Sequence, residues 1–503
     1  MAVDPTQFAE RLRVEICAKL EDSARRKLGQ FLTPPAVSAL LAGMYGPMPA
    51  EVKLLDCGAG LGSLGAAFVE EAIRRPKRPK SIHIISVEIE PEFLPYLKQV
   101  QESCAAFARE HGIELTYEVC SLDFLSLSVD QLRFGFEGKR PHLEGITHVI
   151  MNPPYGKINA GSASRQMIRD AGLETSNLYT GFLWVAARLL APTGELVAIT
   201  PRSWCNGPYF LPFRKQFLGI VALDHIHTFA RRDVLFAGDE VLQENIVFHV
   251  RRGAQLDIVL LSSTDSKGEP GSEREVPYSE VVHVGDEQQF VHLVLDKNGH
   301  DVKERARSGG VSLNELGIKV STGRVVDFRA TEWLRRDPQA GAVPLIYPQH
   351  LAKGWPIDGF KKNNAILSTD GSEEQLVPNG VYVLTKRFTS KEEKRRVVAY
   401  VYEPIPKYSL VGFENHLNYF HADGSPLDLP LAKGLAAFLN SEFVDVYFRQ
   451  FSGHTQVNAT DLRSLRYPTL EQLRELANSK DVEADVAQML KATSGRRAQM
   501  SLP

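Results

Sequence analysis

The stretch KLLDCGAGLGS, residues 53–63, decides the fold class of this chain. Its first residues predict a strand, three glycines follow at positions 58, 60 and 62, and a helical pattern begins at Ser63. Glycine lets the backbone turn sharply and approach a ligand closely, and open α/β sheets bind ligands at the carboxyl ends of their strands. The stretch therefore predicts a strand, a ligand-binding loop and a helix, although a simple strand-to-helix turn can have the same pattern.

Strand and helix patterns alternate through the first half of the chain, which is typical of βαβ units around a parallel sheet. The predicted strands are residues 53–55, 82–87, 115–119, 147–151 and 196–200, and the helices between them include residues 63–75, 91–110 and 177–190. A turn at residues 192–194 precedes the fifth strand, and residues 225–229 and 244–250 are two further strand-like runs. We therefore expect an α/β fold with a mostly parallel, Rossmann-like sheet of seven strands.

The pattern changes after Arg252. Residues 262–275 are rich in Ser, Gly, Glu and Lys, which predicts a surface loop. Beyond Gly309 short strands mix with turns and basic pairs. We expect four regions: an N-terminal helical cap with the α/β domain in residues 1–252, a connecting segment in 253–310, a mixed α+β domain in 311–470 and a helical tail in 471–503.

The composition is that of a globular protein, with 503 residues of which 43% are hydrophobic and 24% charged, and with no apolar run long enough to span a membrane. Residues 1–20 lack the apolar stretch of a secretory signal. The five cysteines are odd in number and scattered, which fits a reducing compartment and argues against a zinc ribbon. We expect a cytoplasmic protein with no membrane segment and no metal. The net charge of −3 gives no global sign of a nucleic-acid partner.

Two acidic residues follow later strands at the edge where the glycine loop lies. Glu88 ends the second strand, and a carboxylate there can accept hydrogen bonds from both hydroxyls of a ribose. Asp123 follows the third strand and can accept from an adenine amino group, while Phe124 covers the ring face. Acidic residues at strand ends are often only solvated, but together with the glycine loop they favour an adenosine-containing cofactor. Because the loop departs from G-x-G-x-x-G, a methyl donor suits it better than NAD.

The tetrapeptide NPPY, residues 152–155, follows an apolar strand and predicts the chemistry. Prolines fix φ and remove donors, so this turn is rigid and presents carbonyl oxygens. An exocyclic amino nitrogen is a weak nucleophile because its lone pair is delocalised into the ring. The side-chain oxygen of Asn152 and the carbonyl of Pro153 can accept its two hydrogens, while Tyr155 stacks on the base. Such catalysis rests on positioning and electrostatics, and it needs neither a covalent intermediate nor a metal.

These motifs, in this order, resemble the gamma class of amino-methylating DNA methyltransferases, which includes the adenine enzymes of type II restriction–modification systems. The resemblance covers about residues 27–252 and begins with KLGQFLTPP at residues 27–35. It implies S-adenosylmethionine as the methyl donor and an adenine that is rotated out of the duplex as the target. The implied catalytic residues are Asn152, Pro153 and Tyr155. The implied cofactor-binding residues are Thr33, Asp56, Gly58, Gly60, Glu88, Asp123, Phe124 and Asn152.

Two later segments also resemble this class. Residues 199–214 resemble the segment that supplies a second aromatic wall for the flipped base. By register we expect Phe210, rather than the adjacent Tyr209, to stack on the base opposite Tyr155. Residues 229–245, which include Arg231 and Phe236, are similar to another segment of the class.

Large N6-adenine enzymes with this order of motifs place target recognition in the C-terminal half. Basic residues gather there and can neutralise phosphates or read guanine, although a single basic cluster is often only a solvated face. Residues 453–468 resemble the end of recognition regions in this class. The candidate DNA-binding residues are Arg324, Arg329, Lys386, Arg387, His454, Gln456 and Asn458. We expect duplex DNA with a specific short sequence as the substrate, a cognate restriction endonuclease that acts separately, and a monomer or dimer.

Several alternatives keep the chemistry and change the substrate. A C5-cytosine enzyme needs a cysteine nucleophile after a proline, and none of the five cysteines follows one. N4-cytosine enzymes more often carry Ser at the position of Asn152, which favours adenine. RNA and protein-glutamine methyltransferases also carry NPPY, but about 250 residues follow the catalytic half here, which favours DNA. A DNA-binding protein with a vestigial methyltransferase fold would have lost Asn152 or the glycine loop, and both are intact.

Overall fold

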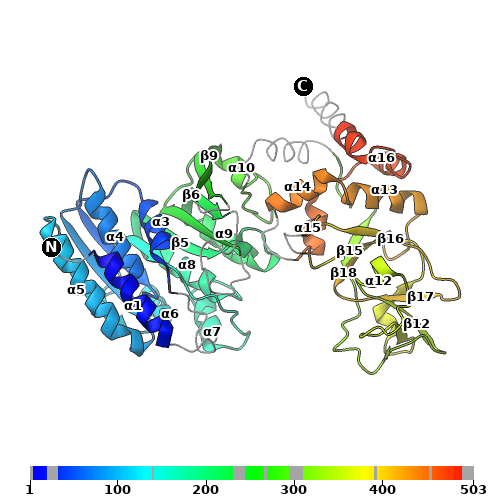
Figure 1. Ribbon diagram of the computed structural model, residues 1–503, viewed down its shortest axis with the longest axis horizontal. Coiled ribbons are helices and arrows are strands. Elements are labelled where there is room, and N and C mark those ends of the chain that lie inside the picture. Colours follow the sequence, from blue (N-terminus) through cyan, green and yellow to red (C-terminus); the bar gives the residue numbers. More distant parts are fainter. Residues whose placement is uncertain are drawn as a thin grey trace. The chain divides into compact units, whose positions relative to one another are not determined.

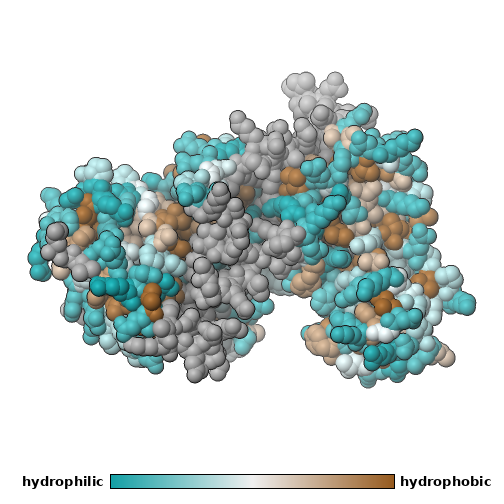
Figure 2. Space-filling model, in the orientation of Figure 1, coloured by the Kyte–Doolittle hydropathy of each residue, from teal (hydrophilic) through white to brown (hydrophobic). Residues whose placement is uncertain are grey.

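The computed structural model of the chain describes residues 4–19, 32–138, 141–229, 244–265, 269–293, 310–389, 393–451 and 456–489. Contacts divide the chain into an N-terminal unit, Met1–Leu295, and a C-terminal unit, Asp296–Pro503 (Figure 1). On the face seen in Figure 2, the surface of the described residues is mostly hydrophilic with scattered hydrophobic patches. Among these described residues, no helix is both long and apolar enough to cross a membrane.

The N-terminal unit is built on one mixed sheet of nine strands in the order β3-β2-β1-β4-β5-β7-β6-β8-β9. The first five strands in this order are parallel, and β7 lies antiparallel between β5 and β6. β6 pairs parallel with β8, and β9 closes this edge antiparallel. The strands are β1 (Glu51–Cys57), β2 (Ser81–Glu88), β3 (Glu114–Ser121), β4 (Ile146–Met151), β5 (Leu190–Pro201), β6 (Val221–Phe229), β7 (Asn245–Arg252), β8 (Ile258–Thr264) and β9 (Pro270–Pro277).

Helices cover both faces of this sheet (Figure 1). Successive residues of a strand point to opposite faces, so Leu54 packs in one core with Phe68, and Leu55 packs in the other core with Leu183. The helices of the first core are α1 (Pro5–Lys19), α3 (Pro35–Gly43), α4 (Ser63–Arg74) and α5 (Leu94–Glu110). Those of the second are α6 (Phe124–Phe134), α7 (Ala163–Asp170), α8 (Leu178–Leu189), α9 (Leu211–Leu218) and α10 (Tyr278–Val281). Burial on both faces explains why central strands such as β4 and β7 are largely apolar.

The sheet is larger than the sequence predicts. Residues 262–275 are not a surface loop, because most of them belong to the β8–β9 hairpin, which brings the sheet from seven strands to nine. β9 lies at the sheet edge and exposes most of its residues, so its polar composition resembles that of a loop. The N-terminal unit therefore continues to Leu295, and the division at Leu295 differs from the predicted connecting segment 253–310. The predicted turn at residues 192–194 lies inside β5, where the register with β4 shifts.

The C-terminal unit holds two small sheets, of order β10-β18-β15-β16 and β11-β13-β12-β17-β14. Their strands are β10 (Lys319–Thr322), β11 (Leu334–Arg335), β12 (Ala342–Ile346), β13 (Ala365–Leu367), β14 (Leu376–Pro378), β15 (Tyr382–Lys386), β16 (Ala399–Tyr402), β17 (Leu410–Phe413) and β18 (Leu417–His421). The helices are α12 (His350–Lys353), α13 (Leu429–Leu439), α14 (Glu442–Phe451), α15 (Ala459–Ser464) and α16 (Leu470–Leu476).

The predicted C-terminal tail is part of this unit as far as residue 489. Leu473 and Leu476 of α16 are buried, and so is Val486 in the helical residues 482–489. All three belong to the core cluster that also contains Leu435 of α13. Residues 471–489 therefore help to form the C-terminal core instead of extending from it as a separate tail.

Candidate active site

The glycine loop lies between β1 and α4, as the sequence predicts. Gly58, Gly60 and Gly62 have φ values of 73°, 56° and 86°, a left-handed conformation that disfavours residues with a Cβ. The N–H groups of Gly58 and Ala59 donate to the carbonyl of Val87 at 2.9 and 3.0 Å. The loop is therefore fastened to the carboxyl end of the neighbouring strand β2.

Glu88 ends β2 with its carboxylate at the loop. One carboxylate oxygen accepts from the N–H of Gly60 at 2.7 Å, and the other accepts from the N–H of Glu90 at 2.8 Å. Only 4% of the residue is exposed, and burial raises the pKa of its carboxyl group. Each oxygen keeps a second lone pair, so the fixed carboxylate can still accept hydrogen bonds from a pair of ligand hydroxyls.

Asp123 is the N-cap of α6. Its carboxylate accepts from the N–H of Leu125 at 3.2 Å and from the hydroxyl of Ser126 at 2.5 Å. The next residue, Phe124, is buried with its ring 4.9 Å from the ring of Phe182 in α8. These two residues therefore supply a polar rim and an aromatic wall at the carboxyl end of β3.

Asp56 lies at the end of β1, underneath the loop. It is fully buried, and a hydrogen bond from the backbone of Gly65 favours its charged form. Burial, assisted by the nearby charge of Glu88, raises the pKa of Asp56 to about 7. A buried carboxylate is costly, so a positive charge or a further donor near Asp56 would stabilise its charged form.

The tetrapeptide follows β4 directly. The amide nitrogen Nδ2 of Asn152 donates to the hydroxyl of Thr33 at 3.1 Å, and its oxygen Oδ1 accepts from the hydroxyl of Tyr155 at 3.0 Å. The Tyr155 hydroxyl also lies 3.3 Å from the carbonyl of Ile199. These contacts fix the orientation of the Asn152 amide, with its oxygen on the side of Tyr155.

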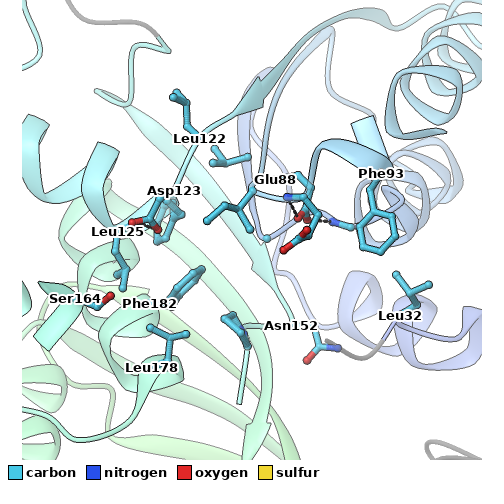
Figure 3. A pocket seen from close by; sticks show the side chains of 17 residues that line it. Leu32, Glu88, Phe93, Leu122, Asp123, Leu125, Asn152, Ser164, Leu178 and Phe182 are labelled. Carbon is cyan, nitrogen blue, oxygen red and sulfur yellow. Dashed lines mark hydrogen bonds between the residues drawn. The ribbon is translucent and has the colours of Figure 1, made fainter. Parts of the chain in front are cut away.

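One pocket joins the ends of β1, β2, β3 and β4 (Figure 3). Its volume is about 340 Å³, within the range of small-molecule sites. Of the eight predicted cofactor-binding residues, six line it: Gly58, Gly60, Glu88, Asp123, Phe124 and Asn152. Thr33 and Asp56 do not line it: Thr33 accepts a hydrogen bond from Asn152, and Asp56 is fully buried. The structure thus brings Asn152 and Pro154 of the tetrapeptide and most of the predicted cofactor residues to a single cavity.

Several apolar residues of the pocket have no part in the sequence prediction. They are Leu32, Ile89, Phe93, Leu122 and Phe182. Ile89 and Leu122 are 54% and 42% exposed, so the pocket has two accessible apolar side chains. α1 also reaches this region, because its Ile16 packs in one cluster with Leu61 and Phe93. Ile89 directly follows Glu88, as Phe124 follows Asp123, and this position could have indicated that it lines the pocket. No sequence motif marks Phe182.

A row of aromatic rings continues from the tetrapeptide. Tyr155 lies 6.3 Å from Tyr179, and Tyr179 lies 5.8 Å from Phe210. Phe210 is only 7% exposed, whereas Tyr209 is 77% exposed. Phe210 is therefore a core residue that reaches Tyr155 only through the ring of Tyr179, and a base can stack on it only if neighbouring side chains move.

Arg214 fastens the segment that carries Phe210. Its side chain is fully buried, and one terminal nitrogen donates to the carbonyls of Trp204 at 2.9 Å and Gly207 at 2.7 Å. Gly207 has no room for a Cβ, which would lie 2.7 Å from the Phe210 ring. Residues 230–243, with Arg231 and Phe236, lie outside the described residues, as do residues 27–31 of the KLGQFLTPP segment.

The candidate DNA-binding residues are all in the C-terminal unit. Lys386 ends β15 and Arg387 follows it, while Gln456 forms a β-bridge with Phe388. Arg324 is exposed just after β10, and Arg329 is exposed with its guanidinium over the ring of Phe328. Asn458 is the N-cap of α15, with its N–H donating to Asp461 at 2.9 Å, and His454 lies outside the described residues. The backbones of Arg387 and Gln456 therefore share one edge, and Asn458 has a helix-capping role.

The chain is similar in sequence to known proteins. The family model of the Eco57I restriction-modification methylase matches residues 135–236, which include the tetrapeptide. The type II methyltransferase M.PstI of Providencia stuartii is 45% identical over 480 residues, covering 94% of this chain and 93% of the relative. The type II methyltransferase M.BsuBI of Bacillus subtilis is 40% identical over 458 residues, covering 90% of each chain.

A solved structure gives the same fold. The type IIL restriction-modification enzyme MmeI, determined in complex with DNA, matches with a TM-score of 0.55 and 12% sequence identity. The match covers 93% of this chain and 72% of that one. At this identity the likeness concerns the fold alone.

Proposed function

The chain belongs to the type II methyltransferases of restriction–modification systems, and we propose that it transfers a methyl group from S-adenosylmethionine to the N6 amino group of an adenine flipped out of duplex DNA. Such methylation protects host DNA from a cognate restriction endonuclease that acts separately. The single observation that carries this proposal is that Asn152, with its amide orientation fixed, lines the same pocket as Glu88 and Asp123.

The residues of the pocket fit S-adenosylmethionine. Glu88 offers a carboxylate for two ribose hydroxyls, and Asp123 with Phe124 offers a polar rim and an aromatic wall for an adenine ring. The buried carboxylate of Asp56, close to the loop but outside the pocket lining, adds a negative charge that would favour the ammonium group at the amino-acid end of the molecule. Bound there, the cofactor supplies a methyl group on a positively charged sulfur.

Asn152 and Pro153 act on the target nitrogen. The oxygen Oδ1 of Asn152 and the carbonyl of Pro153 would accept the two hydrogens of the amino group, so that its lone pair localises on nitrogen. The nitrogen would then bond to the methyl carbon as the methyl–sulfur bond breaks and leaves a neutral thioether, and the methylated nitrogen would release one proton to solvent. The Tyr155 hydroxyl donates a hydrogen bond to Oδ1 at 3.0 Å, and a hydrogen bond from the target amino group would replace it. Thr33 holds Nδ2 throughout, which keeps the oxygen facing the base. Preorganised acceptors of this kind typically contribute several kcal/mol to transition-state stabilisation.

The flipped base needs walls as well as acceptors. Tyr155 provides one face, since the tetrapeptide ends on this ring, and Phe210 provides the second after rearranging from its packed position beside Tyr179. An adenine in a duplex has its N6 atom paired and stacked, so rotation into such a pocket is the only route to the donor.

A product analysis tests the proposal. The purified protein is incubated with isotope-labelled S-adenosylmethionine and equal masses of duplex DNA, RNA and cell protein, and each fraction is digested and separated. We expect the label in N6-methyladenine from DNA. Label in N4-methylcytosine, in RNA or in methylglutamine would refute the substrate and point to the corresponding alternative.

A further inference from the structure

Three segments of the C-terminal unit meet at one edge of its four-stranded sheet. β18 pairs antiparallel with both β10 and β15, so the ends of β10 and β15 lie beside the start of β18. The N–H of Gly323, after β10, donates to the carbonyl of Leu417 at 2.8 Å. The N–H of Arg387, after β15, donates to the carbonyl of His416 at 2.9 Å. The turn between β17 and β18, residues 414–416, is therefore at the centre of this edge.

This turn is held on several sides by backbone hydrogen bonds. Glu414 donates its N–H to the carbonyl of Ile346 at 3.0 Å, and Asn415 donates to Val325 at 2.9 Å. A Cβ on Gly323 would lie 2.2 Å from the carbonyl oxygen of Glu414, so the two backbones are in direct contact. A turn fixed in this way presents its side chains in defined positions.

Within the turn, a buried carboxylate orients a solvent-exposed histidine. Glu414 is fully buried, and its carboxylate oxygens accept from the N–H of His416 at 3.0 Å and from the ring nitrogen Nδ1 of His416 at 2.5 Å. The imidazole keeps 43% of its surface exposed. Because a carboxylate only accepts, Nδ1 carries the proton, and the opposite nitrogen, Nε2, faces away from Glu414.

Aromatic and cationic groups surround the imidazole. The ring of Phe388 lies 4.9 Å from it and is 42% exposed, whereas Phe413 and Phe420 of the neighbouring strands are buried. The guanidinium of Arg387 donates to the carbonyl of Asn415 at 3.2 Å and lies 5.9 Å from the Phe388 ring. The edge thus combines positive charge, an exposed aromatic face and one directional hydrogen-bonding group.

We propose that His416 is a specificity-determining residue, which makes a hydrogen bond through Nε2 to the edge of one base pair in the major groove, with Phe388 packed beside it. This inference rests on the proposed function, since it concerns how the same enzyme selects its DNA. Contacts to phosphates depend on positive charge more than on a fixed hydrogen-bond orientation, and Lys386 and Arg387 supply that charge. A ring locked by a buried carboxylate supplies direction, which is what base reading requires.

Two replacements of His416 separate base reading from a structural role. The side-chain amide of Gln reaches about as far as Nε2 of the histidine. That of Asn reaches only as far as Nδ1, the atom that is hydrogen-bonded to Glu414. If Nε2 reads a base, H416Q retains part of the discrimination and H416N loses it. If the imidazole only supports the turn, H416N is the better replacement.

The measurement is kcat/KM on the unmodified duplex that the wild type methylates. It is repeated on duplexes in which each base pair of the recognition site is replaced in turn. We expect H416N to reduce discrimination about tenfold or more at one base-pair position, with kcat on the original duplex changed less than threefold. We expect F388A to affect the same or the adjacent position. The matched control is F134A, because Phe134 is also an exposed phenylalanine beside an arginine, at 67% exposure, and this variant should leave discrimination unchanged.

Two results would overturn the inference. One is unchanged discrimination at every position in H416N, and the other is an equal loss of rate on all duplexes, which indicates a phosphate contact or a structural role. A wild-type protein that methylates no duplex would instead refute the proposed function.

Discussion

The N-terminal unit gathers its site from the carboxyl ends of four neighbouring strands, whereas the C-terminal unit gathers its exposed polar edge from turns between short antiparallel strands. In the first region, the order of the strands determines which strand ends are neighbours. Glu88, Asp123 and Asn152 lie at such ends and therefore line one pocket. In the second, side chains such as His416 and Phe388 lie on turns, and neither lines the pocket that contains Asn152. Substitutions there can therefore leave that pocket intact. Changes in the first region should therefore affect methylation of every DNA, and changes in the second should alter which DNA is methylated.

The largest effect is expected for Asn152→Ala. Loss of the side-chain acceptor should reduce the methyl-transfer rate about 1000-fold or more on every duplex, because the lone pair of the amino nitrogen is no longer localised. Binding of cofactor and DNA should survive, as isothermal calorimetry and gel-shift assays would show. Full activity in this variant would contradict the assigned mechanism.

Paired variants at Phe210 and Tyr209 test which of these two neighbouring rings stacks on the base in the first region. Phe210→Ala should lower kcat about 10-fold to 100-fold, because it removes a stacking wall worth about 1–3 kcal/mol per base. Tyr209→Ala, at the 77% exposed neighbour, should change kcat less than threefold. The reverse order of effects would move the second wall to Tyr209.

Asp56→Asn should stabilise the free protein. Burial raises the pKa of Asp56 from 3.8 to about 7, so the folded state holds this proton more tightly than the unfolded state. The wild type therefore loses stability as the pH rises from about 4 to 7, by at most about 4 kcal/mol at 1.36 kcal/mol per pKa unit. Thermal melts should show the variant more stable at pH 8, with the difference shrinking below pH 5, and cofactor affinity should fall. A variant less stable than wild type at pH 8 would contradict this account.

The smallest effect is expected at His249, away from both regions. Burial alone lowers the pKa of this group, but hydrogen bonds to Asp224 at 3.0 Å and Glu195 at 2.9 Å outweigh it and raise the pKa above its usual value. The stabilisation is then complete below about pH 6.5 and is lost as the pH rises through the folded-state pKa. The melting temperatures of wild type and His249→Gln should approach each other as the pH rises above about 6.5. A constant difference would mean that His249 does not titrate in this range.

Sequence patterns predicted the first region better than the second for a physical reason. Parallel strands buried on both faces give continuous apolar runs, and Gly58, Glu88 and Asp123 stand at their ends, so spacing alone indicates a shared edge. Strand β9 escaped prediction because an edge strand is polar along its exposed faces. Phe182 and Ile89 escaped because a pocket wall needs only an apolar side chain in the right place. Glu414 and His416 escaped because their pairing depends on the conformation of one turn.

The most direct test of the division between the two regions is the methylation pattern in a host without methylation of its own. The gene for the wild-type chain, for Asn152→Ala or for His416→Asn is expressed there, and the genomic DNA is sequenced for modified bases. We expect N6-methyladenine in one short motif for wild type, none for Asn152→Ala, and additional related motifs for His416→Asn. Methyl groups absent from the DNA of the wild-type strain, or an unchanged pattern in Asn152→Ala, would contradict the account.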